Sequence, residues 1–501
     1  MAIPQLQLEG FQSDRQKRLA KASHRAGITI YPHDNDPVFT QRKSRARYLN
    51  WDPRVTEGTV VQLSWSKRLG APSGSWSAAV KLGRSASIEP MAGDVMDGDW
   101  ADIVINRNGI PFPLCRGVVD SVRLKTGSAG GATTRMLVLT GRDHGAMFEA
   151  IVAWNNIYVQ TVGELCFGLN AKRIPGEPGD TPDGMFEKLI SATFARGEVE
   201  GSWLLDRSDP NSANRSAWNL PPALQTSTGK QIFLEALKIG RSGTRGYFAN
   251  EQQLWTGAGQ SLHQTLTNWC NPLLNEWRYD VGTLRKIGGA YSMAMEANIR
   301  EKPFVNTADA EFSPFFRDLP TWRIPSWLIS DTDLGRSGYE RFNIYQLMAD
   351  MHYYRGQEQL AMTPAIYSRE AIRRHGIRPY NETTKYLMAV EGGGLEDERR
   401  AWQQLIVDWY APNPYLLSGT VTIDAMVPEI QIGSRFILDT GDPTTTLQFY
   451  VEGVDHGFRW APSSGGPSSS TTLMLTRGFR GSDKDYLKMV QAISKQYVDK
   501  F

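Results

Sequence analysis

The chain has 501 residues, of which 41% are hydrophobic and 22% are charged, and its formal net charge is +2. This length is too great for a single hydrophobic core and predicts several domains, while the composition is that of an ordinary folded protein. Because the net charge is so small, binding to nucleic acid through bulk charge is not expected.

The cysteines and the N-terminal sequence bear on where the protein folds. Cys115, Cys166 and Cys270 form no close pair and no metal-spaced cluster, as suits a reducing cytoplasm. The first residues lack the charged and apolar segments of a signal peptide, and no uninterrupted apolar stretch is long enough to cross a bilayer. We therefore expect synthesis in the cytoplasm and no stable insertion into a membrane.

A basic arm is expected over residues 1–54, with a short helix near Asp14 to Ala22. Its charges could contact nucleic acid, but no fold with interleaved aromatic residues accompanies them, so a solvated or partner-bound arm is the favoured interpretation. The basic residues of this arm are Arg15, Lys17, Arg18, Lys21, Arg25, Arg42, Lys43, Arg45 and Arg47.

A first β-domain is expected over residues 55–145. Its strands begin near Thr59, and the turn signal from Gly141 to Gly145 ends it. Alternating apolar residues after Ser73-Gly74 predict a strand with one buried face. The residues on that face are Trp76, Ala78, Val80 and Leu82.

Residues 146–288 predict a mixed, mainly helical domain. Apolar residues have helical spacing from Val162 to Phe167 and from Met185 to Ile190. A further helix is expected from Ser261, which is a good N-cap, to Trp269.

A second β-domain is expected in two pieces, residues 289–317 and residues 411–480. The stretch from Tyr291 to Arg300 alternates as a strand, but it is too early in the chain to be contiguous with the strands after Ser418. An insertion domain over residues 318–410 is therefore expected to interrupt this β-domain.

Helices are expected at two places in the insertion, Arg341 to Tyr353 and Leu395 to Tyr410, where apolar residues recur at helical offsets. The C-terminal segment, residues 481–501, is expected to form a helix from Asp483 to Val498 with one apolar face.

The two β-domains share four features in the same order, which predicts an internal repeat. Each has an alternating strand after Ser-Gly, a glycine-marked turn, a strand with a glycine near a Val-Asp pair, and a small-residue hairpin that leads into a Thr-Thr strand. In the two copies these features are Trp76 to Leu82 and Val421 to Val427, Gly93 to Val95 and Gly433 to Arg435, Arg116 to Asp120 and Val451 to Asp455, and Thr133 to Leu137 and Thr471 to Leu475.

One strand of the second copy changes the parity of its inward face, as a β-bulge at Gly453 would make it do. The inward residues are Leu447, Phe449, Val451, Val454 and Phe458. Bulged, strongly twisted strands close small sheets into barrels. The predicted fold is an α+β, multi-domain protein with two tube-like antiparallel β-barrel domains and helical or mixed insert domains. The alternative is that any two antiparallel sheets share such alternation.

No catalytic, cofactor-binding or metal-binding residues are predicted. The seven histidines are scattered, and the chain has no phosphate-binding loop, Rossmann glycine pattern or nucleophile elbow. The pairs Asp143-His144 and Asp455-His456 lie at strand edges, where we expect structural hydrogen bonds. The acids from Glu396 to Glu398 open a helix, which the helix dipole favours, and are not expected to form a glycosidase pair.

The chain has 15 tryptophans, and several lie in expected loops or edges. Core packing explains most of them, but aromatic residues and arginine are also typical of large protein interfaces. Three copies of a chain with two similar barrels could form a pseudo-sixfold ring, which could bind a hexameric ring on one side and a threefold object on the other. The tryptophans in question are Trp51, Trp100, Trp154, Trp218, Trp322 and Trp327.

Several stretches together resemble the baseplate hub proteins of phage tails, which are related in fold to the N-terminal half of type VI secretion spike proteins and to phage late control proteins. The resemblance extends over residues 55–480, and its motifs are structural. The stretches are Ser73 to Ser77 with Gly93-Asp94, Arg116 to Asp120, Gly141 to Asp143, Leu274 to Asp280 and Tyr450 to His456.

The resemblance implies a homotrimeric cup in the tail baseplate of a virion, assembled in the host bacterial cytoplasm. Its barrels would start assembly of the tail tube from the tail tube protein. Its other face would bind a central spike protein, and other baseplate proteins would surround it. The bore would pass the tape-measure protein and then DNA without specific binding, so acidic or neutral charge is expected there. No lysozyme domain and no strand-repeat tail after Phe479 is recognisable, so both are expected in other chains.

Two other classes of function are open at this point. A carbohydrate-binding or cell-wall-degrading tail protein would have a cleft with two acids flanked by exposed aromatic rings, and would act as a monomer. A nucleic-acid-binding protein would lose its binding steeply with salt and on deletion of residues 1–50.

Overall fold

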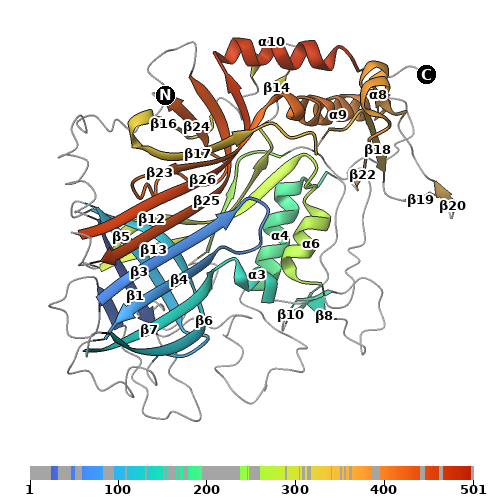
Figure 1. Ribbon diagram of the computed structural model, residues 1–501. Helices are drawn as coiled ribbons and strands as arrows, with labels where there is room; N and C mark the ends of the chain where they lie inside the picture. Colours follow the sequence, from blue (N-terminus) through green and yellow to red (C-terminus); the bar gives the residue numbers. More distant parts are fainter. Residues whose placement is uncertain are drawn as a thin grey trace.

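A computed structural model gives the fold (Figure 1). The residues that it describes are 24–31, 47–50, 59–82, 95–107, 110–129, 132–150, 153–154, 165–167, 170–172, 179–194, 237–244, 246, 260–287, 290–303, 305–306, 311–312, 318–339, 341–349, 352–354, 357–359, 364–384, 395–439, 446–461 and 466–497.

The largest element is a sheet that has 13 strands among the described residues. One half of it, which we call module 1, has the strand order β1-β5-β6-β7-β4-β3, and β2 pairs with β1 and, through Asn50 and Thr59 alone, with β3. The strands of module 1 are β1 (His24–Tyr31), β2 (Arg47–Asn50), β3 (Thr59–Arg68), β4 (Ser75–Lys81), β5 (Trp100–Arg107), β6 (Ile110–Ala129) and β7 (Ala132–Asp143).

The other half, module 2, repeats this arrangement with the order β16-β24-β25-β26-β23-β17. The one difference in direction is that β16 runs parallel to β24, whereas β1 runs antiparallel to β5. The strands of module 2 are β16 (Thr321–Pro325), β17 (Ile329–Gly335), β23 (Leu417–Ile423), β24 (Arg435–Asp439), β25 (Leu447–Ala461) and β26 (Gly466–Arg480).

Matching irregularities show that the two modules are equivalent strand by strand. The turn of the β6–β7 hairpin follows the residue pair Ala129–Ala132, and the turn of the β25–β26 hairpin follows the pair Ala461–Gly466. Counting from these ends, the bulges in β6 and β25 fall at equivalent residues, Asp120 and Glu452. The bulges in β3 and β17 also correspond. Shared alternation alone would not reproduce one strand order and two bulges, so the predicted repeat and the bulge next to Gly453 are confirmed.

The residue-by-residue alignment of the two copies that was expected from the sequence is wrong. Asp120 corresponds to Glu452 and not to Asp455, and Thr133 corresponds to Pro467 and not to Thr471. The glycine of the turn before β24, Gly433, corresponds to Gly98. Strand patterns recur every two residues, so a shifted alignment matches the hydrophobic residues almost as well as the correct one.

The structure places parts of three expected regions differently. β1 and β2 come from the expected basic arm and are strands of module 1, while the helix expected at Asp14 to Ala22 lies outside the described residues. β16 and β17 come from the expected insertion and belong to module 2. The strand expected from Tyr291 to Arg300 is present as β13 (Ala290–Glu301), but it pairs with β11 (Leu237–Arg241) and β12 (Asn275–Ile287) in a separate sheet.

The helices agree better with the sequence. Ser261 is the N-cap of α6, as expected, and the structure adds a capping box between Ser261 and Gln264. The helix expected from Arg341 to Tyr353 is wrong, because its described residues form the strands β18 (Ile344–Ala349) and β19 (His352–Tyr354), and Tyr345 and Leu347 are buried with the period of a strand. Leu165 to Phe167 is also a strand, and the residues before it lie outside the described part. The helices are α3 (Ala146–Ala150), α4 (Pro182–Phe194), α6 (Leu262–Trp269), α8 (Arg369–His375), α9 (Leu395–Tyr410) and α10 (Asp483–Ser494), with the 3-10 turns η3 (Ser326–Leu328) and η4 (Asn413–Tyr415).

The remaining strands are short and form small sheets beside the modules. They are β8 (Ala153–Trp154), β9 (Leu165–Phe167), β10 (Asn170–Lys172), β14 (Val305–Asn306), β15 (Glu311–Phe312), β18 (Ile344–Ala349), β19 (His352–Tyr354), β20 (Gln357–Gln359), β21 (Ile366–Tyr367) and β22 (Pro379–Thr384).

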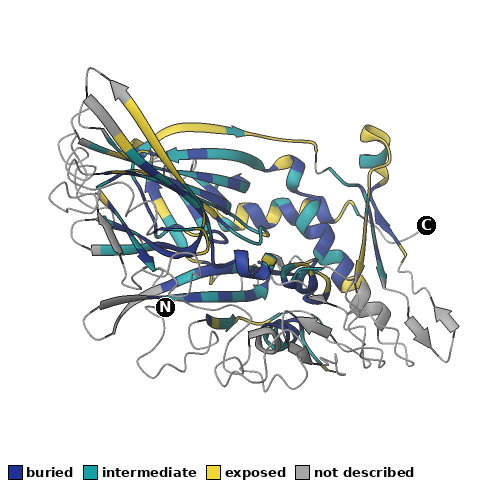
Figure 2. Ribbon diagram, turned by 90° about the horizontal axis from the view of Figure 1, so that it is seen from below, coloured by how far each residue is buried: buried dark blue, intermediate teal, exposed yellow. Residues whose placement is uncertain are grey.

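Each module encloses its own hydrophobic core, and a third core lies where the helices meet the hairpin of β12 and β13. Figure 1 shows α3, α4 and α6 gathered beside module 1, with α9 and α10 at the end of module 2. In Figure 2 the buried residues run along the inner strands and the facing sides of these helices, while exposed residues mark the outer strands. The hairpin of β12 and β13 therefore sits between the two modules and the helical layer.

Candidate functional site

The two modules meet edge to edge at a junction that we call the seam. β3 pairs antiparallel with β25 over seven residue pairs, from Gly453 opposite Arg68 to Arg459 opposite Gln62. Since β3 also pairs with β4, the sheet continues from one module into the other. The ring of Trp65 stacks on that of His456, with 5.5 Å between their centroids.

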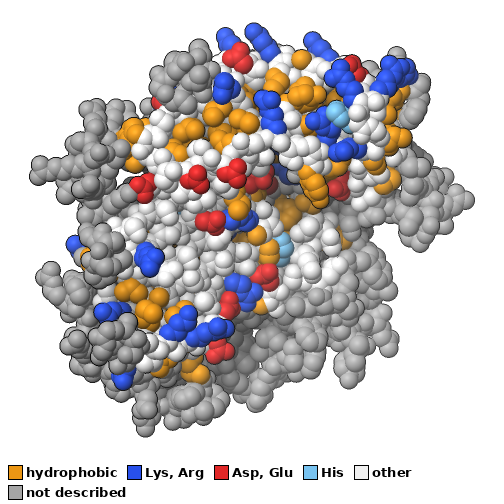
Figure 3. Space-filling model, in the orientation of Figure 1, with side chains coloured by type: hydrophobic (Ala, Val, Ile, Leu, Met, Phe, Trp, Pro, Cys, Tyr) orange, Lys and Arg blue, Asp and Glu red, His pale blue; other side chains and the backbone are white. Residues whose placement is uncertain are grey.

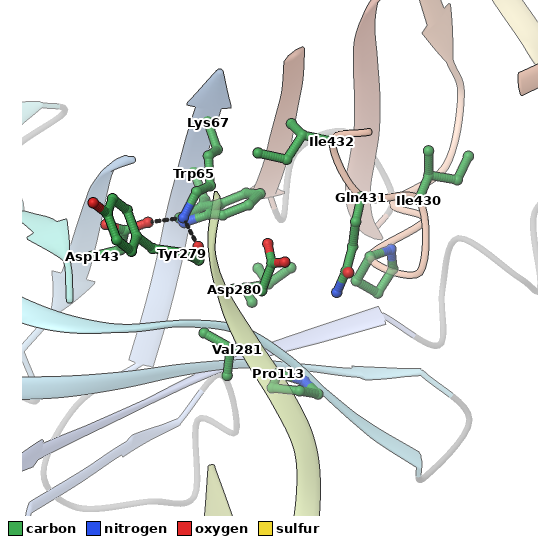
Figure 4. A pocket seen from close by; sticks show the side chains of 12 residues that line it. Trp65, Lys67, Pro113, Asp143, Tyr279, Asp280, Val281, Ile430, Gln431 and Ile432 are labelled. Carbon is green, nitrogen blue, oxygen red and sulfur yellow. Dashed lines mark hydrogen bonds and ion pairs between the residues drawn. The ribbon is translucent and has the colours of Figure 1, made fainter. Parts of the chain in front are cut away.

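A buried ion pair lies directly behind the seam. Lys67 Nζ lies 2.5 Å from Asp143 Oδ2 and also donates to the carbonyl oxygen of Tyr279 in β12 (Figure 4). The two charged side chains are 4% and 2% exposed. The second oxygen of Asp143 accepts a hydrogen bond of 2.9 Å from the backbone N–H of Gly145. A buried charge pair is tolerated only when its remaining atoms find partners, so this ion pair holds β3, β7 and β12 in one arrangement.

A second buried ion pair ties the same hairpin to module 1. Arg116 donates two hydrogen bonds to Asp102, at 2.6 and 2.7 Å, and a third to the carbonyl oxygen of Met293 in β13 at 2.8 Å. Tyr31 of β1 donates to the same carboxylate at 2.9 Å. The bidentate pair thus positions β1, β5, β6 and β13 together.

Two arginines of the hairpin reach module 2 in turn. Arg278 donates to the carbonyl oxygen of Ile432 at 3.1 Å, and Arg300 donates to that of Gly433 at 2.7 Å. Glu276 pairs with Arg300 and accepts a hydrogen bond from Tyr450 at 2.8 Å. Although burial opposes the charge of Arg300, Glu276 raises its pKa above the usual value, so the guanidinium stays charged. The hairpin therefore contacts both modules and fixes their relative orientation.

The two Asp-His pairs make structural hydrogen bonds, as expected, and each residue has its own partner. His144 is buried, its Nε2 lies 3.2 Å from the carbonyl oxygen of Glu296, and burial lowers its pKa. His456 Nδ1 lies 2.9 Å from Thr471 Oγ1, while Asp455 accepts two hydrogen bonds from Arg68. In neither pair does the structure record an Asp-to-His hydrogen bond among the described contacts.

Other expected site features are distributed through the fold. Cys115 and Cys270 are buried free thiols, and the described residues contain no cluster of three or more His, Cys, Asp or Glu side chains placed to hold a metal ion. Trp100 is fully buried, whereas Trp327 is 38% exposed; Trp51 and Trp218 lie outside the described residues. Within the described ranges, no helix combines the length and the apolar character needed to span a membrane.

Cavities in the described part of the chain are of two kinds. The one behind the seam, shown in Figure 4, has a volume of 20 Å³, which is about the space for one water molecule. A larger cavity of 330 Å³ lies at the end of the seam and contains Glu276 and Glu452 together with Tyr339, Trp409 and Tyr410. It has two acids and aromatic rings, but Glu276 already binds Arg300 and Tyr450, so it is not poised as a free acid.

Comparison with known proteins found no matching family profile and no matching curated protein. Solved structures do match. A tail protein from Neisseria meningitidis MC58 is 12% identical, with a TM-score of 0.44, over 93% of this chain and 99% of that one. The 43 kDa tail protein of prophage MuSo2 from Shewanella oneidensis is 10% identical, with a TM-score of 0.45, over 92% and 99%.

A further match is the half-lidded Francisella PdpA-VgrG complex, at 8% identity and a TM-score of 0.41, over 94% of this chain and 62% of the matched chain.

The sequence pointed to the seam only indirectly. The turn glycines and the bulge were visible, but the contacts of Lys67 and Arg116 were not, because their partners lie far away in the chain. Lys67 is separated from Tyr279 by 212 residues. The one local signal is that Leu63, Trp65 and Lys67 share an inward-facing parity, which places a lysine on the buried side of its strand.

Proposed function

We propose that this protein is the structural hub of a phage tail baseplate, a homotrimer that adapts a threefold central spike to a sixfold tail tube. The observation that carries the proposal is the seam: two modules with the same strand order lie edge to edge in one continuous sheet. Three such chains supply six equivalent modules, which is the number that a quasi-sixfold ring requires. The sequence resemblance to tail hub proteins supports the same assignment.

In this proposal each module is a tube-like barrel, and the helical regions and the insertion decorate the outside of the ring. Pairing of β2 with both β1 and β3 supports closure of module 1. The bulges in β6 and β25 increase strand twist, which a small barrel needs. Because β16 and β17 pair with β23 and β24, the insertion that interrupts module 2 begins after Gly335.

The mechanism is geometric and uses no catalytic group. One face of the ring binds the tail tube protein, the other binds the central spike and further baseplate proteins, and the bore passes the tape-measure protein and then DNA. A conduit for DNA must not retain phosphate, so the bore-facing charge is acidic or neutral. The protein acts in the virion and assembles in the host bacterial cytoplasm.

The test is the native mass of the purified chain, alone and with the spike and tube proteins, followed by electron microscopy. A particle of three times 56.0 kDa, seen as a ring with six similar lobes, is the expected result. A chain that stays monomeric at high concentration with both partners present would overturn the proposal.

The alternative is a carbohydrate-binding or cell-wall-degrading tail protein, for which the cavity with Glu276 and Glu452 is the supporting observation. It requires that the monomer bind or cleave peptidoglycan fragments and that Glu452→Gln abolish this. Glycan binding by the monomer, lost in that variant, would favour the alternative; a trimer that binds no glycan favours the hub.

A further inference from the structure

Several strand edges of the large sheet are unpaired in the described part of the chain, and two of them, on β17 and β6, are matched by the seam. β17 is the last strand of module 2 and pairs only with β23; residues 330–333 are exposed. β6 pairs with β7 from Gly117 to Ala129 but with β5 only as far as Val118, so among the described residues the segment 121–127 has one open edge. Such edges present a row of backbone N–H and C=O groups to another strand.

The seam indicates which kind of strand can pair with the open edge of β6. β25 is the equivalent of β6; it pairs with β24 only as far as Tyr450, and beyond that point it receives β3. The turn before this point is the same in both modules, since Gly98 N–H donates to Val119 O at 2.8 Å and Gly433 N–H donates to Val451 O at 2.7 Å. The open edge of β6 is therefore equivalent to the edge of β25 that pairs with β3. β17 is the equivalent of β3.

We propose that β17 of one copy pairs antiparallel with β6 of a second copy, in the register that the seam defines. The proposal rests on the proposed trimer and names the contact between its chains. His456 is equivalent to Leu124, and Trp65 is equivalent to Leu334, so the seam register places these two leucines opposite each other. The next pair along the strands is Lys125 with Asp333.

The chemistry of the two edges is complementary in this register. Arg123 and Lys125 share one face of β6 and are exposed, and Asp331 and Asp333 share the facing side of β17 and are exposed. Lys125 lies directly opposite Asp333, whereas Arg123 and Asp331 lie diagonal to the opposite charges, across from Gly335 and Gly127. Leu124 is 43% exposed, and the pairing covers it with Leu334. Opposite charges and apolar side chains directly across a strand pair both stabilise it.

The same kinds of contact occur within the chain. On the outward face of the seam, Arg68 forms an ion pair with Asp455. On the inward face, the ring of Trp65 stacks on that of His456. Figure 3 shows acidic side chains in a band at the level of β17 and basic side chains over the lower part of module 1. The occupant of each edge is therefore a second copy of this chain, because each copy carries both complementary edges.

A head-to-tail contact of this kind closes into a ring when its rotation divides a full turn with no shift along the axis, and otherwise it extends into an open filament. If the contact between chains reproduces the seam, six equal junctions alternate around the ring, three within chains and three between them. The geometry thus links the repeat inside one chain to the number of chains in the assembly.

Disulfide trapping tests the register in the full-length protein. Two double variants, Leu124→Cys with Leu334→Cys and Lys125→Cys with Asp333→Cys, place cysteines at directly opposed positions. Neighbouring antiparallel pairs alternate between wide and close Cα spacing, so one of the two variants has the closer geometry that a disulfide needs. Under mild oxidation we expect a covalent species of three chains in at least one variant.

The controls are each single-cysteine variant and Leu124→Cys with Thr332→Cys, which is displaced by two residues from the proposed register. We expect at least a tenfold lower yield of cross-linked trimer in these controls. A native trimer with no cross-link in either opposed variant overturns the β6–β17 contact and leaves the hub function standing. A chain that remains monomeric and forms no cross-link overturns both. Cross-linked chains that do not close at three support the contact and overturn the threefold hub.

Charge reversal supplies an independent readout. Arg123→Glu with Lys125→Glu on β6 should abolish the native trimer, and so should Asp331→Lys with Asp333→Lys on β17. All four substitutions together restore complementary charges and should restore the trimer. Trimers that persist in both two-residue variants would overturn the proposed contact.

Discussion

The guanidinium of Arg68 donates two hydrogen bonds to the carboxylate of Asp455, at 2.9 and 2.8 Å, across the seam between β3 and β25. The two residues belong to different modules and are 387 positions apart in the chain. An ion pair at this place contributes to the alignment of two strands that no loop connects directly.

Replacing Arg68 or Asp455 by alanine should therefore weaken the seam modestly. Both side chains are about one-third exposed, at 33% and 36%, so water and salt screen the pair. We expect a coupling free energy of about 0.5 to 1 kcal/mol in a double-mutant cycle, falling as salt is raised. The measurement is the denaturant midpoint of the two single variants and the double variant.

Arg142 and Asp120 provide the matched control, because their pair is similarly exposed but lies within module 1. If removal of either ion pair lowers stability equally, while only the Arg68 variants change the cooperativity of unfolding between the modules, the role of the seam holds. Identical unfolding profiles in all variants would contradict it.

Lys67→Met should be far more damaging than any surface substitution. It removes the cation that lies 2.5 Å from the buried carboxylate of Asp143 and leaves that charge without its partner. Breaking a buried ion pair in this way costs about 3 to 5 kcal/mol. Chemical denaturation monitored by tryptophan fluorescence would measure the loss.

The rescue variant is Lys67→Met together with Asp143→Leu. Replacing both charges by apolar side chains removes the unpaired carboxylate, so most of the lost stability should return. A double variant as unstable as Lys67→Met alone would mean that the contact of Lys67 with Tyr279, or packing, dominates and not the ion pair.

Acid should destabilise the protein through His456. Burial lowers the pKa of its ring to about 3, while Asp455 acts in the opposite direction. An unfolded histidine has a pKa of about 6.5, so between about 6.5 and about 3 the unfolded state binds the extra proton. Stability is therefore full above about pH 6.5 and falls below it, by up to ~1.4 kcal/mol per pH unit for this one group.

The measurement is the free energy of unfolding between pH 7.5 and about pH 4.5 for the wild type and for His456→Gln. The variant should have a shallower slope, with the residual slope owed in part to His144, whose pKa burial also lowers. Parallel profiles for the two proteins would show that His456 is protonated in the fold without cost.

The sequence predicts the repeat because its most distinctive features are local. Glycine turns and a parity change next to Gly453 can be read in one pass along the chain. The exact alignment cannot, since an alternating pattern matches after a shift. β17 was missed for a related reason: Ile329 to Gly335 is polar at an exposed edge, and its strand conformation comes from pairing with β23.

The seam itself depends on long-range contacts that composition does not reveal. Arg116 and Met293 are 177 positions apart, and Glu276 and Tyr450 are 174 apart. The hairpin of β12 and β13 was assigned in part to module 2, because its strands alternate like those of a barrel. Its pairing with β11 and its arginine contacts show that it is a separate element between the modules.

Two equivalent turn glycines permit a direct test of that hairpin. Gly98 and Gly433 both have positive φ, 86° and 74°, so alanine strains the backbone at either position. A Cβ at Gly98 meets no atom within 4 Å, whereas at Gly433 it would lie 2.6 Å from Arg300 Nη2 and 2.7 Å from Arg278 Nη1. These guanidinium groups are the ones that hold module 2.

Gly98→Ala should therefore cost only the backbone strain, about 1 to 2 kcal/mol, and Gly433→Ala should cost about 1 to 2 kcal/mol more, because the charged hydrogen bonds to Ile432 and Gly433 are displaced. Denaturant midpoints of the two variants give the difference directly, since the backbone term is common to both. Equal losses would mean that the arginines move aside freely, and that the hairpin positions module 2 through apolar packing and not through Arg278 and Arg300.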